Sequence, residues 1–161
     1  MVKINFRAIG IVHSPFQEIE GMPIQPTGAR GIQGTIEVFP EFVAGLQDLD
    51  GFSHIILIYH LHRAGKSRLV VTPFLDTQPR GVFATRAPRR PNPIGLSIVK
   101  LVKREQDVLH IENVDMVDGT PLLDIKPYVP EFDRQPKCRV GWLEHAPGVV
   151  RSKKSDGRFR S

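Results

Sequence analysis

The sequence predicts an all-β fold, namely a small β-barrel with one or two short helices. Two observations lead to this prediction. The 14 glycines and 14 prolines among 161 residues interrupt the chain too often for long helices. Between these breaks, short apolar and β-branched runs recur, without the strand–helix–strand alternation that indicates a doubly wound sheet. With 40% apolar and 24% charged residues, the chain has the composition of a single globular domain.

The expected strands follow from apolar residues that either alternate with other residues or form short continuous runs. Ile4, Phe6 and Ala8 alternate near the N-terminus, whereas residues 55–58 form an unbroken apolar run. In chain order, the expected strands span residues 4–12, 35–39, 54–59, 69–72, 82–85, 94–102 and 108–114, and a further extended run begins at Thr120.

One helix is expected over residues 40–49. Pro40 suits a first helical turn. The apolar residues that follow have helical spacing, and they are Phe42, Val43, Leu46 and Leu49. Residues 21–34, which precede this helix, are rich in Gly, Pro and Gln and predict a long loop. Loops of that length inside a compact domain are often functional.

We expect one domain over residues 1–147, followed by a basic and flexible tail over residues 148–161. No apolar stretch reaches membrane-spanning length, and the first residues lack the pattern of a signal peptide. We therefore expect a cytoplasmic protein that does not enter a membrane. The single cysteine, Cys138, excludes an internal disulfide and a cysteine-based metal cluster.

The formal net charge of +5 points to an anionic partner, and the basic residues are unevenly distributed. Residues 77–104 contain seven Lys or Arg side chains and no Asp or Glu. The tail adds five more basic residues after Val150. Residues 77–104 are therefore a candidate anion-binding surface. The alternative is a solvated basic face that acidic residues elsewhere in the fold offset.

The most unusual segment is G-V-F-A-T-R-A-P-R-R-P-N-P-I-G-L, over residues 81–96. Its three prolines restrict the backbone, so the loop has less conformational entropy to lose when it binds a ligand. On this stiff frame the chain presents Arg86, Arg89, Arg90 and Asn92. Such residues suit a carboxylate, a phosphate or the edge of a nucleotide base. The alternative is a tight solvent-facing turn.

A second unusual segment is V-D-M-V-D-G-T-P-L-L-D-I-K-P-Y-V-P, over residues 114–130. Asp118-Gly119 indicates a turn, and Thr120-Pro121 begins a new extended run. The segment holds three carboxylates close together, and Lys126 and Tyr128 follow; the carboxylates are Asp115, Asp118 and Asp124. A carboxylate beside an amine or sulfonium ligand is the functional interpretation, and a capped turn followed by an ordinary strand is the structural one.

Three histidines, His54, His60 and His62, have the same parity in and after one expected strand and so share a face if the strand continues. Histidines on one face can bind a metal ion, but no cysteine lies nearby and residues 51–75 contain no carboxylate. We therefore interpret the three as half-buried structural histidines and expect no metal site.

Five segments together resemble the TsaA-like, or YaeB, family, which includes the TrmO tRNA (adenine-37-N6)-methyltransferase. The segments are I-G-I-V-H-S-P-F from Ile9, F-S-H-I-I-L-I-Y from Phe52, G-V-F-A-T-R from Gly81, R-P-N-P-I-G from Arg90 and V-D-G-T-P-L-L-D-I-K-P-Y from Val117. The resemblance covers about residues 6–133, and its last two motifs are long and unusual.

The resemblance implies a β-barrel methyltransferase that binds S-adenosyl-L-methionine without a Rossmann sheet. It implies a homodimer with the cofactor site near the interface, and tRNA as the substrate. The implied reaction is N6-methylation of threonylcarbamoyladenosine at tRNA position 37. By motif position, the implied cofactor contacts are Gln25, Pro26, Thr27, His62, Arg63, Arg86, Leu96, Asp118, Gly119, Thr120, Pro121 and Leu122.

Roles in the reaction are hypotheses that follow from these positions. N6 of the substrate base is a weak nucleophile, so a carboxylate that accepts its proton would help, and Asp118 and Asp124 are the candidates. Arg86 is expected to hold the cofactor. The expected substrate contacts are Arg89, Arg90, Asn92, Lys126 and Tyr128. Two alternatives stay open at this point: a methyltransferase with another acceptor, and an RNA-binding β-barrel without catalytic activity.

Overall fold

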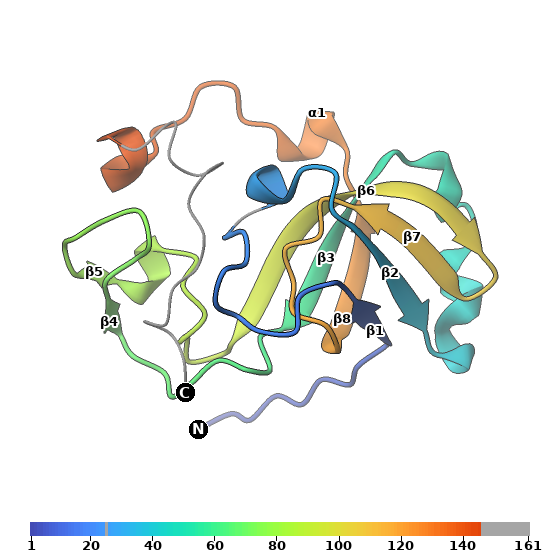
Figure 1. Cartoon of the computed structure of the whole chain (residues 1–161), viewed down its shortest axis with the longest axis horizontal. Coiled ribbons are helices and arrows are strands. Elements are labelled where there is room, and N and C mark those ends of the chain that lie inside the picture. The colour runs from blue at the N-terminus through green and yellow to red at the C-terminus, as the bar shows by residue number, and fades with distance from the viewer. Residues whose placement is uncertain (25, 146–161) are drawn as a thin grey trace.

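The computed structural model describes residues 1–24 and 26–145, and its centre is a closed six-stranded barrel (Figure 1). Each strand pairs antiparallel with its neighbours. In spatial order the strands are β1 (Gly10–His13), β2 (Gln33–Val38), β7 (Val108–Glu112), β6 (Ile94–Glu105), β3 (His54–His60) and β8 (Thr120–Pro127). The predicted small β-barrel is confirmed.

The barrel interior is filled by every second side chain of its strands. Along β3, for example, Ile55, Leu57 and Tyr59 are buried, whereas the residues between them face outward. The same alternation places Val99 and Leu101 of β6 in the core. Each fully buried large aliphatic side chain stabilises the fold by roughly 1.5–3 kcal/mol, so the alternation in the sequence is what specifies the barrel.

A small lobe, residues 61–93, is inserted between β3 and β6. It contains β4 (Val70–Val71), β5 (Arg80–Gly81) and the 3-10 helix η4 (Val82–Ala84), and it lies to the left of the barrel in Figure 1. Its own small core holds three buried residues and the partly buried Phe74; the buried residues are Val71, Val82 and Ala87.

The helices are short, as predicted, but the expected helix over residues 40–49 is divided in two. The 3-10 helix η2 spans Pro40–Leu46 and the 3-10 helix η3 spans Leu49–Gly51. Between them Asp48 has a φ of +66°, which a continuous right-handed helix does not accommodate. Leu46 and Leu49 are nevertheless buried against the barrel, as their spacing predicted.

The remaining helical segments are equally short. They are the 3-10 helices η1 (Pro26–Ala29) and η5 (Gly141–His145) and the single α-helical turn α1 (Pro130–Asp133). No helix in the described part of the chain is long and apolar enough to cross a membrane. The predicted tail, residues 148–161, lies outside the described residues.

One expected strand is wrong, and the first, over residues 4–12, is confirmed only from Gly10 as β1. Residues 4–9 are not a strand, because the partner strand β2 ends at Val38 and Pro40 starts η2, which leaves Ile4 and Phe6 exposed. Residues 82–85 are not a strand either, because the amide of Thr85 donates to the carbonyl of Val82 and closes a 3-10 turn. Of the three histidines, only His54 is half-buried, whereas His60 and His62 are exposed.

Candidate functional site

Most of the sequence-predicted cofactor contacts that the structure describes lie at one end of the barrel, which we call the site end. Here β1, β3 and β7 end and β2, β6 and β8 begin. His62 and Arg63 follow β3, Leu96 lies near the start of β6, and the turn at Asp118 precedes β8. The pairing of Tyr59 with Gly95 on one side and with Leu122 on the other joins these segments.

Three of the predicted contacts belong to the Gln-Pro-Thr segment before Ala29. Gln25 lies outside the described residues, and Pro26 and Thr27 begin η1. Leu122, in contrast, is fully buried in the barrel core, and its carbonyl accepts a hydrogen bond from the amide of Ile9 at 2.8 Å. Arg86 is exposed, in the loop that leaves η4.

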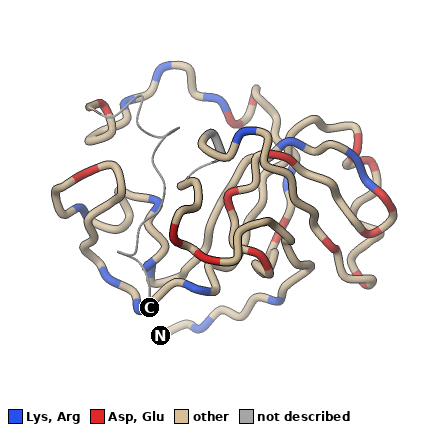
Figure 2. Tube along the Cα trace, in the orientation of Figure 1, with Lys and Arg blue, Asp and Glu red and all other residues tan. Residues whose placement is uncertain are grey.

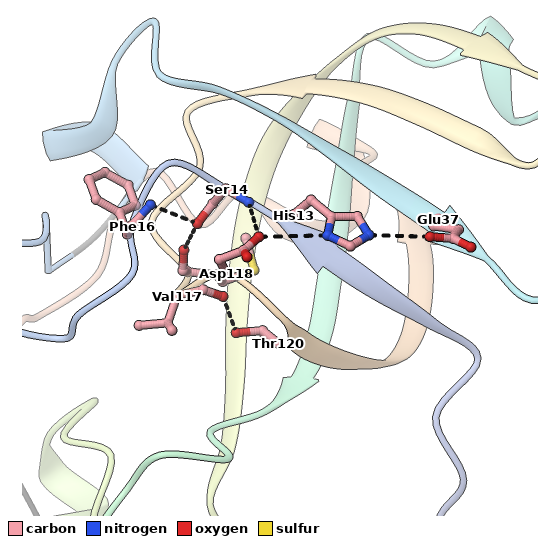
Figure 3. A network of polar contacts seen from close by, with 8 residues as sticks. His13, Ser14, Phe16, Glu37, Val117, Asp118 and Thr120 are labelled. Carbon is pink, nitrogen blue, oxygen red and sulfur yellow. Dashed lines mark hydrogen bonds and ion pairs between the residues drawn. The ribbon is translucent and has the colours of Figure 1, made fainter.

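Asp118 connects its turn to the loop that follows β1 (Figure 3). Its Oδ1 accepts a hydrogen bond from the amide of Ser14 at 3.0 Å and lies 3.6 Å from Nδ1 of His13. The Ser14 hydroxyl donates to the carbonyl of Met116 at 2.6 Å, and the amide of Asp118 donates to the carbonyl of Phe16 at 2.7 Å. Through its Oδ1, this carboxylate therefore holds two loops together.

The Asp-Gly sequence is required by the shape of this turn. Gly119 has a φ of +79°, a left-handed conformation that favours glycine, and its amide donates to the carbonyl of Val12 at 2.9 Å. The hydroxyl of Thr120 donates to the carbonyl of Val117 at 2.6 Å and fixes the start of β8. The turn thus aligns β8 with β1, with which it pairs.

Arg63 ties the same loop to the end of β3. Its Nη1 donates to the carbonyl of Gln17, and its Nη2 lies 3.5 Å from Oε2 of Glu18. The neighbouring His62 has a pKa below its ordinary value because partial removal of its ring from water, and then the nearby His60, disfavour the charged ring. Residues 14–18 therefore bridge two of the predicted contact groups.

In the proline-stiffened loop, Arg90 stabilises the loop itself. Its Nη1 donates to the carbonyls of Val82, Thr85 and Ala87 at 3.0, 2.7 and 3.3 Å, and its guanidinium lies 5.9 Å from the centre of the Phe83 ring. These contacts hold the loop around η4. A contact between Arg90 and a substrate stays a prediction, as does one for the exposed Asn92.

Arg89 lines a cavity of about 510 Å³ in the lobe. Its Nε is buried and has no hydrogen-bond partner among the described residues. The cavity wall also contains Arg68, Thr72 and Thr77, and the carboxylate of Asp76 there is ion-paired with Arg80 at 2.6 Å. Figure 2 shows that basic positions predominate in this lobe, where Asp76 is the single acidic residue among residues 61–93.

Three other predicted residues do not join this cluster. Asp124 lies in β8 opposite Ile58, and its Oδ2 is 2.9 Å from Nζ of Lys126, which raises the pKa of that amine. The amide of Tyr128 donates to the carbonyl of His54, at the start of β3. Because β3 spans seven residues, Tyr128 lies roughly 20 Å along the strand direction from the residues after β3.

Asp115, in the loop between β7 and β8, is a carboxylate with a strongly shifted pKa. The sequence motifs did not identify it as a candidate base or ligand-binding residue. Its Oδ1 accepts a hydrogen bond from the hydroxyl of Ser97 at 2.7 Å, and that hydroxyl lies 2.8 Å from the hydroxyl of Tyr59. Burial raises the pKa of Asp115 to about 6, although Ser97 and the positive charge of Arg86 oppose the rise. Burial, with the charge of Asp115, also raises the pKa of Tyr59.

A signal for Asp115 was present in the sequence. Its neighbours Val114 and Met116 are both apolar, and in the structure both are buried. A carboxylate between two buried apolar residues is a candidate for a raised pKa.

The chain matches the family model described as the tRNA-methyltransferase O N-terminal domain over residues 11–134. A Pyrococcus abyssi protein named "Probable S-adenosyl-L-methionine-binding protein" is 57% identical over 158 residues, which cover 98% of this chain and 86% of that protein. The Escherichia coli protein named tRNA (adenine(37)-N6)-methyltransferase is 33% identical over 92% of this chain and 68% of its own.

A solved structure with the same fold is that of TrmO from Pseudomonas aeruginosa. It superposes with a TM-score of 0.74 at 38% identity and covers 88% of this chain. The present chain spans 63% of the length of that protein.

Proposed function

Because the chain belongs to the tRNA-methyltransferase O family, we propose that it is an S-adenosyl-L-methionine-dependent methyltransferase that acts on tRNA. The specific reaction we propose is methylation of N6 of threonylcarbamoyladenosine at position 37. The observation that carries the proposal is the meeting of Arg63, Arg86, Leu96 and the Asp118 turn, which come from distant parts of the sequence, at the site end of the barrel.

The side chains at the site end have the chemistry that this cofactor requires. S-adenosylmethionine carries a carboxylate together with positively charged ammonium and sulfonium groups. The guanidinium of Arg86 suits the carboxylate, and the carboxylate of Asp118 suits the cationic groups. When bound, the cofactor supplies an electrophilic methyl group, and the protein has to hold the accepting atom in line with it.

The basic lobe is the proposed contact surface for tRNA. Residues 61–93 contain seven Lys or Arg side chains against one acidic residue, and Arg68 and Arg89 line the cavity of the lobe. Phosphate contacts of this kind supply affinity that does not depend on base sequence and that weakens with salt. A tRNA substrate also supports a cytoplasmic location, which we propose on that ground.

We propose that two copies associate through the outer face of β3 and β6. Three exposed apolar residues lie there in a row on β6, namely Ile94, Leu96 and Ile98. Two of them pair directly with isoleucines of β3, since Ile98 lies opposite Ile56 and Leu96 opposite Ile58. Such a contiguous apolar strip supports association with a second surface. Because Leu96 is also a predicted cofactor contact, this interface would adjoin the cofactor site.

The test is to incubate the purified protein with S-adenosylmethionine and tRNA that carries threonylcarbamoyladenosine, and to weigh the nucleosides by mass spectrometry. We expect one added methyl group on that nucleoside and none on tRNA that lacks the modification. Arg86→Ala should lower both cofactor affinity and product. Arg7→Ala, which changes an exposed arginine outside the barrel, is the matched control and should alter neither.

The other outcomes distinguish the alternatives. Cofactor binding by calorimetry without a methylated nucleoside would favour another acceptor. Absence of both cofactor binding and product would refute the proposed enzyme and favour an RNA-binding module.

A further inference from the structure

Asp115, Ser97 and Tyr59 form an ordered chain of hydrogen bonds at the site end. The hydroxyl of Ser97 is 2.7 Å from Oδ1 of Asp115 and 2.8 Å from the hydroxyl of Tyr59. An ionised carboxylate has no proton to donate, so Ser97 donates to Asp115. Ser97 has one hydroxyl hydrogen, so Tyr59 donates to Ser97. Both donors therefore point toward the carboxylate, which strengthens each bond in the chain.

The barrel fixes this chain in place. Tyr59 ends the inward-facing series of β3, and its ring lies across Gly95 of β6, where an added Cβ would be 2.5 Å from Cζ of the ring. Ser97 is 1% exposed and Tyr59 7%, so neither hydroxyl has free access to solvent. The last glycine of the R-P-N-P-I-G motif is therefore required because Tyr59 occupies the space of a side chain.

Asp115 differs from the other two carboxylates of its segment in what surrounds it. Asp118 accepts from the Ser14 amide and lies near His13, and Asp124 is ion-paired with Lys126. Asp115 forms no ion pair within 4.0 Å among the described residues. The titratable groups near enough to affect its charge are Tyr59 of β3 and Arg86 after η4.

We propose that Asp115 is the catalytic base of the methyl transfer, and that Ser97 and Tyr59 position its carboxylate. This role rests on the proposed function. The bond from N6 of the base to the methyl carbon forms as the bond from sulfur to that carbon breaks, which releases S-adenosylhomocysteine. N6 becomes more acidic in the same step, and its proton passes to the carboxylate of Asp115.

The surroundings of Asp115 suit this role. A base works best when its pKa lies near the working pH, and burial moves the pKa of Asp115 from its ordinary value to about 6. The carboxylate must be ionised to accept a proton, so the rate should rise with pH through that region. The hydrogen bond from Ser97, and to a smaller extent the charge of Arg86, lower the pKa of Asp115 and so favour its ionised form.

The experiment compares single-turnover rates across pH 5–9 at saturating cofactor and modified tRNA for the wild type, Asp115→Asn and two further variants. We expect the wild-type rate to fall about tenfold per pH unit below the pKa of the base, which gives the pH–rate profile an acidic limb. The rate of Asp115→Asn should be lower by about 100-fold or more at neutral pH, and its profile should lack this limb. Ser97→Ala should move the limb. Asp107→Asn, which changes a carboxylate in the turn between β6 and β7, is the control and should keep both rate and limb.

A second readout uses the protein without cofactor or tRNA. Carbon-13 NMR of the carboxyl groups should show a resonance that titrates near pH 6 and disappears in Asp115→Asn. Calorimetry should show that Asp115→Asn keeps the cofactor dissociation constant within about threefold of the wild type, because a base acts on the acceptor nitrogen.

Three outcomes would overturn the proposal. An Asp115→Asn variant with the wild-type rate and limb would remove Asp115 from the chemistry while leaving the proposed function intact. Loss of the limb in Asp124→Asn in place of Asp115→Asn would assign the base to Asp124. A wild-type protein that binds cofactor but methylates no tRNA would refute the proposed function, and this role of Asp115 with it.

Discussion

The raised pKa of Asp115 predicts that this carboxylate lowers the stability of the barrel at neutral pH. In the unfolded chain an aspartate titrates near its ordinary value of 3.8, whereas in the folded protein Asp115 titrates at about 6. Between these values the unfolded state has released its proton and the folded state still holds it. The free energy of unfolding therefore falls as pH rises through this window, and the penalty is complete above the folded pKa.

The magnitude follows from the size of the shift. A difference of about 2 pKa units corresponds to about 3 kcal/mol. Because the residue surface of Asp115 is half-buried rather than fully buried, we expect a smaller penalty of about 2 kcal/mol. Asn has the shape of Asp and keeps an acceptor for Ser97, but it does not titrate. Relative to the wild type, Asp115→Asn should therefore gain about 2 kcal/mol of stability between pH 4 and pH 7.

Urea unfolding of both proteins at several pH values measures this gain. The amide hydrogens of Asn change the stability by an amount that is independent of pH, so the informative quantity is the change of the difference with pH. Other carboxylates that titrate in the same range cancel in that difference. A difference that stays constant within about 0.5 kcal/mol from pH 4 to pH 7 would refute the reasoning that burial raises this pKa.

Three further predictions test other parts of the structure. Gly95→Ala should cost roughly 1–3 kcal/mol of stability in urea unfolding, because the added Cβ meets the ring of Tyr59. Adding Tyr59→Leu to this variant should recover part of the loss, and equal stability of Gly95→Ala and wild type would contradict the prediction. In filter-binding assays, tRNA binding should weaken for Arg68→Ala and for Arg89→Ala, and the slope of log affinity against log salt should become shallower by about 1 in each. Arg7→Ala should leave the slope unchanged. An unaltered slope in the two lobe variants would show that the lobe does not contact tRNA. Ile98→Lys places a charge in the apolar strip of β6 and should convert the dimer to a monomer, which halves the mass measured by analytical ultracentrifugation. The control Lys103→Ala should keep the mass of the dimer. A wild-type protein that is monomeric would refute the interface.

The barrel was predictable because its strands bury one face, and burial of one face leaves a period of two in the sequence. The same period misled over residues 4–9, since Ile4 and Phe6 alternate correctly but no strand is available to pair with them. Alternation indicates which side chains favour burial, but a strand also needs a neighbouring strand to form hydrogen bonds with. The tertiary fold determines whether that neighbour is present.

The candidate site was predictable only in part. The resemblance identified the segments that meet at the site end, but sequence spacing grouped Lys126 and Tyr128 with them although β8 leads these two residues to the opposite end of the barrel. Asp115 was noticed as one of three nearby carboxylates and not selected. Its character depends on Ser97 and Tyr59, which are 18 and 56 residues away in the chain, and spacing within one segment does not contain that information.

Closure of the barrel has a consequence for synthesis of the protein. β1 pairs with β8 through Gly10 and Leu122, so the last seam of the barrel joins segments about 110 residues apart. At about 5–20 residues per second, β1 waits roughly 6–22 seconds on the ribosome before its second neighbour exists. Throughout that interval its open edge is free to pair with another nascent chain. The edge of β1 that closure protects in the finished barrel is therefore exposed during synthesis. Variants that slow elongation or lengthen the lobe would extend that exposure.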